Sequence, residues 1–182
     1  MGQGFRGPGG EISEIHGSDR QFHHPRPPAR CRRKKGGEDH AIGRSRGGLS
    51  TKINAVVDES GLPVRLMLTA GQAHDLNAAP HLLAGLPCRH VVADRGYDAD
   101  ALLALIRASG AKAHIPSMRS RLIQRTVSRQ IYRQRNLVER YFNKLKHFRR
   151  IATRFDKLAR NFLAAVALAS TRLWLRTYES TT

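Results

Sequence analysis

The sequence LSTKINAVVDESGLPVRLMLTAGQ, residues 49–72, carries the clearest structural signal in this chain of 182 residues. It contains two runs rich in residues that favour β-structure, at 51–57 and 64–69. The four residues DESG between the runs form a turn cluster of hairpin length. The stretch therefore predicts an antiparallel β-hairpin.

Downstream of the hairpin, helix-like and strand-like segments alternate. The predicted helices span residues 74–86, 101–108, 130–149 and 156–175, and the predicted short strands span residues 88–93 and 112–115. The polar, basic segment 117–129 has neither caps nor a clear period, and it predicts a mobile loop. This order indicates a mixed α/β architecture in layers, in which a hairpin feeds a sheet.

Upstream of the hairpin, residues 1–48 are rich in Gly, Pro, Arg and His and contain only five large apolar residues. Such a segment has little to bury, so we expect it to be disordered or loosely attached. Neither of the two glycine-rich motifs that bind nucleotides occurs anywhere in the chain. A doubly wound nucleotide-binding fold is therefore not indicated.

The charge is strongly positive and unevenly distributed. The whole chain has a formal charge of +18, and residues 1–50, 51–116 and 117–182 carry +5, 0 and +13. A neutral middle joined to a basic final third is typical of proteins that neutralise nucleic-acid phosphates. A merely solvated basic surface and an RNA-binding or ribosome-associated protein are the alternatives.

The compartment follows from what the sequence lacks. Cys31 and Cys88 lie far apart, so neither a disulfide framework nor a cysteine-rich zinc site is indicated. No apolar run approaches the roughly 18–20 residues that a membrane span needs, and the N-terminus lacks the apolar core of a signal peptide. These features predict a cytoplasmic location and no membrane partner.

Two acidic residues stand out by position. Asp94 ends a predicted buried strand, where α/β proteins often present functional carboxylates, although it could instead cap a turn. Glu139 lies in a basic helix, where it could bind a metal or form a salt bridge with Arg135 or Arg140. Tyr132, Arg135, Glu139 and Lys146 advance by 3, 4 and 7 residues, and therefore share one helix face.

This spacing resembles the Y-(2)-R-(3)-E-(6)-K signature of DDE transposases of the insertion sequence 4 and 5 superfamily. Further stretches resemble the insertion sequence 5 type, over about residues 34–176. They are KKGGEDHAIGRSRGGLSTKINAVVD, TAGQAHD, VVADRGYDAD and RNLVERYFNKLKHFRRIATRFDKLARNFLAA.

The resemblance implies a ribonuclease-H-like mixed sheet with flanking helices, in which three carboxylates bind two Mg²⁺ ions. The implied reaction cuts a DNA strand and joins the freed 3′-OH to target DNA. Asp94 and Glu139 match the second and third carboxylates, as catalytic residues and metal ligands. Tyr132, Arg135, Lys146, Lys52, Arg44 and Arg46 are the expected DNA contacts. Transposon ends and target DNA are the expected partners, together with a homo-oligomer.

The first carboxylate of the family has no clear counterpart here. Residues 1–33 are expected to be disordered or translated out of frame, and residues 34–176 to form the catalytic domain without its first strand. Asp19 lies at about the right distance from Lys34, but no apolar strand precedes it. Read one nucleotide later, codons for residues 22–33 can encode Ser-Thr-Ile-Arg-Ala-His-Gln-His-Ala-Ala-Gly, which is close to the family text.

The sequence therefore leaves three interpretations of the protein. The chain is a metal-dependent transposase or its catalytic portion, an inactive DNA-binding remnant, or the downstream half of a frameshifted enzyme. Whether it is an enzyme depends on the first carboxylate.

Overall fold

The predicted hairpin is present in the computed structural model, which describes residues 12–17, 22–23, 40–45 and 48–180. Strands β4 (Gly48–Val57) and β5 (Pro63–Ala70) pair antiparallel, from Thr51 opposite Ala70 to Val57 opposite Pro63. Asp58 Oδ1 closes the turn by accepting hydrogen bonds of 2.9 Å from the Ser60 and Leu62 amides. Gly61 adopts a φ of 74°, which a residue with a side chain rarely tolerates.

A single mixed sheet is built on this hairpin. Its other strands are β1 (Ile12–Gly17), β2 (Phe22–His23), β3 (Gly43–Ser45), β6 (His90–Val92) and β7 (Lys112–His114). The path of paired strands runs β2–β4–β1–β6–β7, and β3 and β5 also pair with β4. Strand β1 is antiparallel to β4 and parallel to β6, and β6 is parallel to β7.

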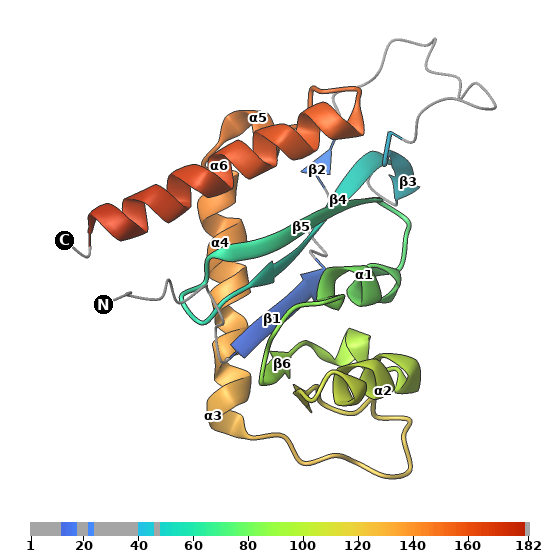
Figure 1. Cartoon of the computed structure of the whole chain (residues 1–182). Helices are drawn as coiled ribbons and strands as arrows, with labels where there is room; N and C mark the ends of the chain where they lie inside the picture. Colours follow the sequence, from blue (N-terminus) through green and yellow to red (C-terminus); the bar gives the residue numbers. More distant parts are fainter. Residues whose placement is uncertain (1–11, 18–21, 24–39, 46–47, 181–182) are drawn as a thin grey trace.

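The position of β1 corrects the prediction that the fold lacks its first strand. Residues 12–17 lie in the middle of the sheet, between β4 and β6, and pair with both (Figure 1). This segment has only isolated large apolar residues, Ile12 and Ile15, and so lacks the apolar run that marks a buried strand. A strand with a partner on each edge is specified by backbone pairing as well as by composition. The rest of residues 1–33, apart from β2, lies outside the described residues.

Helices cover both faces of the sheet. In chain order they are η1 (Asp75–Asn77), α1 (Ala79–Leu83), η2 (Arg95–Tyr97), α2 (Asp100–Ala108), α3 (Arg129–Tyr132), η3 (Arg133–Arg135), α4 (Asn136–Lys146), α5 (Arg149–Ala152) and α6 (Ala159–Glu179). The predicted helix at 74–86 is instead η1 followed by α1, because Pro80 starts a new helix at its first turn. The 130–149 helix is formed in consecutive pieces.

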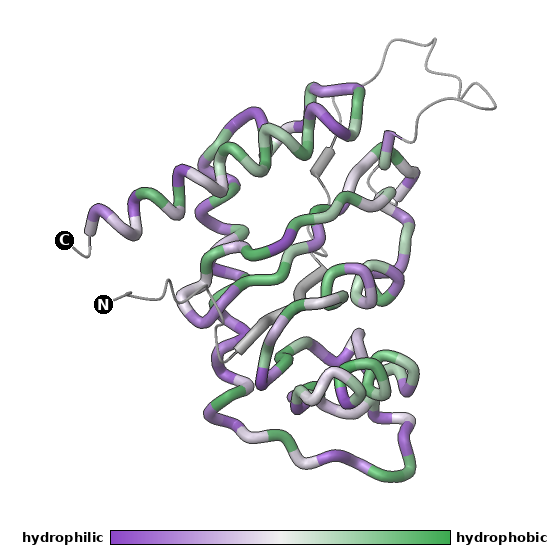
Figure 2. Tube along the Cα trace, viewed as in Figure 1, coloured by the Kyte–Doolittle hydropathy of each residue, from purple (hydrophilic) through white to green (hydrophobic). Residues whose placement is uncertain are grey.

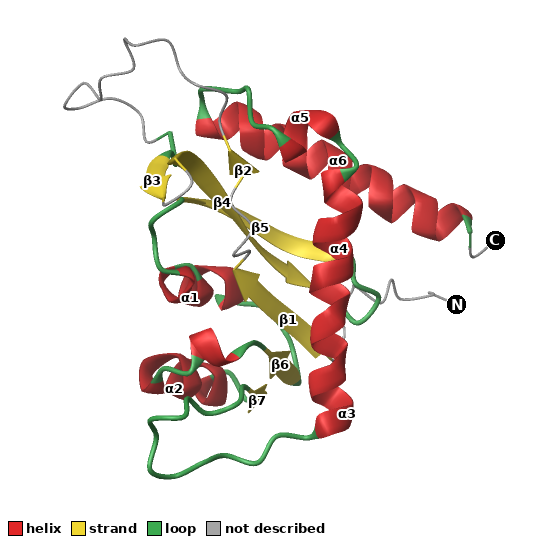
Figure 3. Ribbon diagram, turned by 180° about the vertical axis from the view of Figure 1, so that it is seen from behind, coloured by secondary structure: helices red, strands yellow, loops and turns green. Residues whose placement is uncertain are grey.

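The alternation of side chains along β4 divides the core in two. Val56 faces a cluster with Val91, Leu102 and Ile106, under α1 and α2. Its neighbours on β4 point the other way, into a second cluster beneath α4 and α6; they are Ile53, Ala55 and Val57. Figure 3 shows α4 running across the sheet on this second side. Each fully buried large aliphatic side chain stabilises the fold by about 1.5–3 kcal/mol.

A buried polar contact joins the two helices of the second cluster. The Tyr141 hydroxyl on α4 and the Ser170 hydroxyl on α6 lie 2.8 Å apart, and Ser170 also donates to the Val166 carbonyl. Burial raises the pKa of Tyr141 to about 12, which the bond to Ser170 only partly opposes. The phenol therefore stays neutral at physiological pH. None of the helices among the described residues is both long and apolar enough to span a membrane.

Candidate active site

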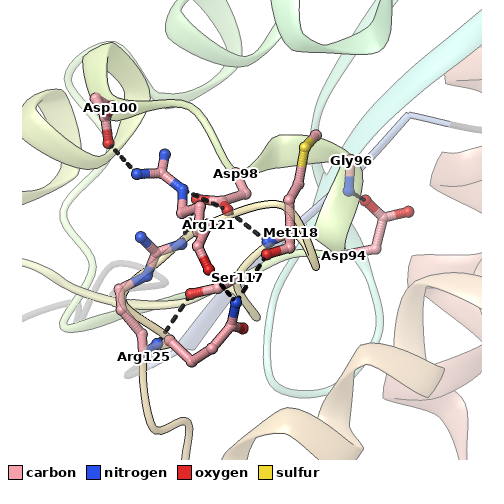
Figure 4. A network of polar contacts seen from close by, with 9 residues as sticks. Asp94, Gly96, Asp98, Asp100, Ser117, Met118, Arg121 and Arg125 are labelled. Carbon is pink, nitrogen blue, oxygen red and sulfur yellow. Dashed lines mark hydrogen bonds and ion pairs between the residues drawn. The ribbon is translucent and has the colours of Figure 1, made fainter.

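Asp94 lies two residues after the buried strand β6, as the sequence predicts, and its carboxylate caps η2. Asp94 Oδ1 accepts a hydrogen bond of 2.9 Å from the Gly96 amide. A Cβ at position 96 would lie 3.1 Å from this oxygen, so glycine allows the close approach. The side chain is half-buried, and Figure 4 shows its other oxygen turned away from Gly96. Asp94 therefore does cap a turn, which was the alternative to a functional role, and it caps the turn with Oδ1.

A cavity of about 310 Å³ opens beside Asp94. Its walls come from η2, from β4 and from the segment that follows β5: Lys52, Gln72, Ala73, His74, Asp75, Asp94, Gly96 and Tyr97. His74 Nδ1 accepts a hydrogen bond of 3.2 Å from the Leu76 amide, so this histidine caps η1. The cavity thus brings Asp94 together with a second carboxylate, that of Asp75.

Glu139 lies on the first turn of α4, in a chain of contacts along one side of the helix. The Arg135 guanidinium lies 6.0 Å from the centre of the Tyr132 ring, and Arg135 Nη1 lies 2.8 Å from Glu139 Oε1. Three of the four residues predicted to share a helix face, Tyr132, Arg135 and Glu139, are thus linked by contacts. The salt bridge that was the alternative for Glu139 is present as well.

The strength of this salt bridge determines whether Glu139 is available to a ligand. The side chains of Arg135 and Glu139 are 31% and 34% exposed. Ion pairs at this exposure and helical spacing stabilise a protein by about 0.3–0.5 kcal/mol. A divalent cation could displace such a partner at little cost in free energy. The ion pair therefore orients Glu139 and leaves its carboxylate able to bind a ligand.

The donor chemistry fits Mg²⁺ in kind, because carboxylate oxygens are the ligands that this hard cation takes in proteins. The number of candidate ligands is too small for the expected set of three carboxylates. Among the side chains that the structure describes, no three of His, Cys, Asp or Glu form a group that could hold a metal ion. Asp19, the candidate for the first carboxylate, lies outside the described residues. Asp94 lines the cavity described above, whereas Glu139 is not among the residues that line it.

The expected DNA contacts lie in unlike environments. Arg44 on β3 and Lys146 at the end of α4 are exposed, whereas Arg46 lies outside the described residues. Lys52 is only 8% exposed, and its Nζ donates to Asp75 Oδ1 at 2.9 Å and to the Ala73 carbonyl at 3.0 Å. Lys52 therefore neutralises Asp75 at the cavity wall.

The most strongly bound carboxylate of this region, Asp98, was not among the residues predicted for the site. It lies at the other end of η2 from Asp94, and its side chain is fully buried. Asp98 Oδ2 accepts hydrogen bonds from the Met118 amide at 2.7 Å and from Arg121 Nε at 2.8 Å, and Oδ1 accepts one from Arg125 (Figure 4). The sequence carries one sign of these contacts. Arg121 and Arg125 have no acidic residue close to them in the sequence, so any ion-pair partner must come from a distant segment.

These contacts anchor residues 117–128, which make up nearly all of the mobile loop predicted at 117–129. The segment has no regular structure, but three donors fasten it to Asp98, and Arg121 also pairs with Asp100 at 2.8 Å. Burial alone would raise the pKa of the Asp98 carboxyl. The bonds from Met118, Arg125 and Arg121 outweigh burial and hold this pKa below its usual value. The carboxylate therefore stays ionised and keeps the loop anchored.

One basic residue of the final third serves the fold instead of a surface. Arg154 is fully buried, and its guanidinium donates to Thr51 Oγ1 and, at 2.8 Å, to the His40 carbonyl. The group also lies 4.8 Å from the centre of the Phe162 ring. Burial lowers the pKa of Arg154 to about 10, which still leaves it charged at neutral pH. Arg154 therefore ties β4 to the helical layer.

Two comparisons with known proteins give matches over most of this chain. The family model described as "Transposase DDE domain" matches residues 10–174. A protein of Brucella ovis, "Putative transposase for insertion sequence element IS6501", is 42% identical over 130 residues. The alignment covers 70% of this chain and 100% of the Brucella ovis protein.

Proposed function

Because this chain belongs to the DDE transposase family of insertion elements, we propose that it binds the ends of its element and cuts and joins DNA strands. The proposal depends chiefly on one observation. A half-buried carboxylate at the end of β6, Asp94, opens on a cavity, and a second one, Glu139, is held by the Tyr132–Arg135 pair.

Asp94 and Glu139 are the proposed metal ligands, with Mg²⁺ as the proposed ion. Paired divalent cations would activate the attacking oxygen and stabilise the leaving oxygen during strand transfer. The chain's own residues orient the ligands. The Gly96 amide fixes one oxygen of Asp94, and Arg135 pairs with one oxygen of Glu139.

The finer assignment is an insertion sequence 5 type with a ribonuclease-H-like fold. An antiparallel hairpin, a central strand and two further parallel strands in one sheet support this fold. DNA would approach along the basic side of the helix that carries Glu139. Exposed cations there include Arg133, Arg140, Lys144 and Lys146. Their charge would displace counterions from the DNA backbone, which makes binding sensitive to salt.

The first carboxylate is a separate proposal. Strands β1 and β6 are parallel neighbours, so their carboxyl ends meet at the same edge of the sheet, the edge where Asp94 lies. Asp19 is the first acidic residue after β1 and is the side chain to test there. The competing proposal is that this segment is translated out of frame. The codons of residues 22–33 decide it, since codons that cannot encode the family text one nucleotide later would exclude the shift.

The test is strand cleavage of a DNA that carries both ends of the element, by the purified full chain with MgCl₂. Glu139→Gln should lower the cleavage rate by at least about 100-fold, because it removes a metal ligand and leaves the side-chain volume unchanged. Glu59→Gln, in the exposed hairpin turn, is the matched control and should cleave like the wild type. Equal rates for Glu139→Gln and wild type would contradict the assignment.

A second function is favoured by the incomplete set of ligands among the described side chains. In that case the chain binds DNA without cutting it. Purified protein would then bind element ends in a manner that weakens steeply with salt, yet leave every strand intact in Mg²⁺ or Mn²⁺. Any cleavage that depends on Glu139 would rule this second function out.

A further inference from the structure

The loop between β7 and α3, residues 117–128, ends in an apolar tip. Leu122 and Ile123 are 102% and 82% exposed, which makes them the two most exposed large apolar side chains among the described residues. Figure 1 shows the loop running along one end of the molecule, and Figure 2 shows hydrophobic colour within it. Adjacent apolar side chains that are left in solvent are typical of interaction sites.

The tip is held in place, because the residues on both sides of it are fixed. Arg121 and Arg125 are bound to Asp98, as described above. Gln124 Nε2 donates to the Arg121 carbonyl at 2.8 Å and to the Met118 carbonyl at 3.1 Å, which closes the loop on itself. Exposure of Leu122 and Ile123 is therefore a built feature of the loop.

The anchor of the loop lies next to the candidate active site. Asp94 caps the beginning of η2 and Asp98 lies at its end, so one helical turn separates the proposed metal ligand from the carboxylate that holds the loop. At its other end the loop leads into α3 and Tyr132. The loop that carries the tip is therefore anchored next to the proposed site at one end and continuous with the Tyr132 segment at the other.

Charge indicates which ligand the tip fits. Residues 117–138 contain six arginines and no acidic residue, and Arg119 and Arg129 are exposed. A second copy of this chain would bring the same positive charge to the contact and be repelled. Duplex DNA combines the two properties required, an anionic backbone outside and an apolar base stack inside. Proteins that insert Leu or Ile between base steps exploit this combination.

We propose that the loop presses Leu122 and Ile123 between base pairs of the bound DNA and unstacks them beside the active site. The inference rests on the proposed function, since it requires that the chain binds DNA. Local unstacking would free a strand to bend toward Asp94. The arginines around the tip would hold the flanking phosphates.

The experiment uses the full chain and two 30-base-pair duplexes of one sequence, one fully paired and one with two adjacent central mismatches. A 2-aminopurine beside the mismatch reports unstacking as a rise in fluorescence. Wild-type protein should bind the mismatched duplex about tenfold more tightly. Unstacking costs a few kcal/mol in a paired duplex, and the mismatches lower this cost. Fluorescence should rise on binding to either duplex.

The double substitution Leu122→Ala, Ile123→Ala should abolish the preference and the fluorescence rise, and leave affinity for the paired duplex within twofold. The matched control is Leu168→Ala, Leu175→Ala, which removes exposed leucines from α6 and should behave like the wild type.

The outcomes separate this inference from the proposed function. If the wild type binds neither duplex, DNA binding itself fails and the inference falls with it. Equal binding of both duplexes, or a preference that the tip variant retains, overturns the inference and leaves the proposed function standing. A tip variant that alters only the sedimentation of the protein would make the tip a self-association surface, which also overturns the inference.

Discussion

Asp94 and Asp98 lie at opposite ends of the same one-turn helix, yet their carboxylates have opposite surroundings. Asp98 is fully buried and accepts hydrogen bonds from one amide and two guanidinium groups. Asp94 is half-buried and bonded to the Gly96 amide. A carboxylate with both oxygens engaged cannot take a metal unless the loop detaches, whereas Asp94 keeps capacity for one. The difference gives Asp98 a structural role and leaves Asp94 as the carboxylate proposed to bind a metal.

Stability measurements provide the most direct test of this difference. Asp98→Ala should lower the free energy of unfolding by about 2–4 kcal/mol, because it leaves a buried amide and two guanidinium groups without their acceptor. Asp94→Asn should lower it by less than about 1 kcal/mol, since asparagine still caps a helix. Urea-induced unfolding of the full chain measures both. Equal losses for the two variants would contradict the assignment of roles.

Elements with local signals were predicted well. The hairpin follows from two β-rich runs and a turn cluster, all within residues 49–72, and the structure differs only at the strand ends. The helical segment at 130–149 follows from spacing along a single helix, and Val138, Tyr141 and Leu145 in it are buried. Asp94 could likewise be placed, because a buried strand ending in an acidic residue is visible in the sequence.

Features that depend on distant residues were missed. Strand β1 is defined by partners 37 or more residues away, on β4 and β6, and its own composition gives little sign of it. The bonds from the loop to Asp98 join residues 20 to 27 positions apart. Arg154 counted among the basic residues expected at a surface, yet it lies beneath Phe162. Neither periodicity nor a charge count can reveal which residues meet in space.

The second test uses pH. The pKa of Asp98 is lowered in the folded protein, so its contribution to stability is present above the unfolded value of about 3.9 and is lost as the pH falls through the folded pKa. We expect Asp98→Asn to be less stable than the wild type at pH 7, and the gap to narrow below about pH 4. Urea unfolding at pH 7, 5 and 3 measures this gap. Taking the difference between variants removes the effect of the other carboxylates. A gap that stays constant down to pH 3 would show that the charge of Asp98 does not hold the loop.

The smallest effect on stability is expected at the salt bridge between Arg135 and Glu139, the other proposed metal ligand. Arg135 and Glu139 are each about one-third exposed, whereas the Asp98 side chain is fully buried. Arg135→Met should therefore lower the free energy of unfolding by only about 0.3–0.5 kcal/mol, and 0.5 M NaCl should abolish even this difference. Arg133→Met, two residues earlier and exposed, is the control for loss of charge alone. A loss above about 1 kcal/mol that persists in salt would make Glu139 a structural acid like Asp98, and would count against its role as a metal ligand.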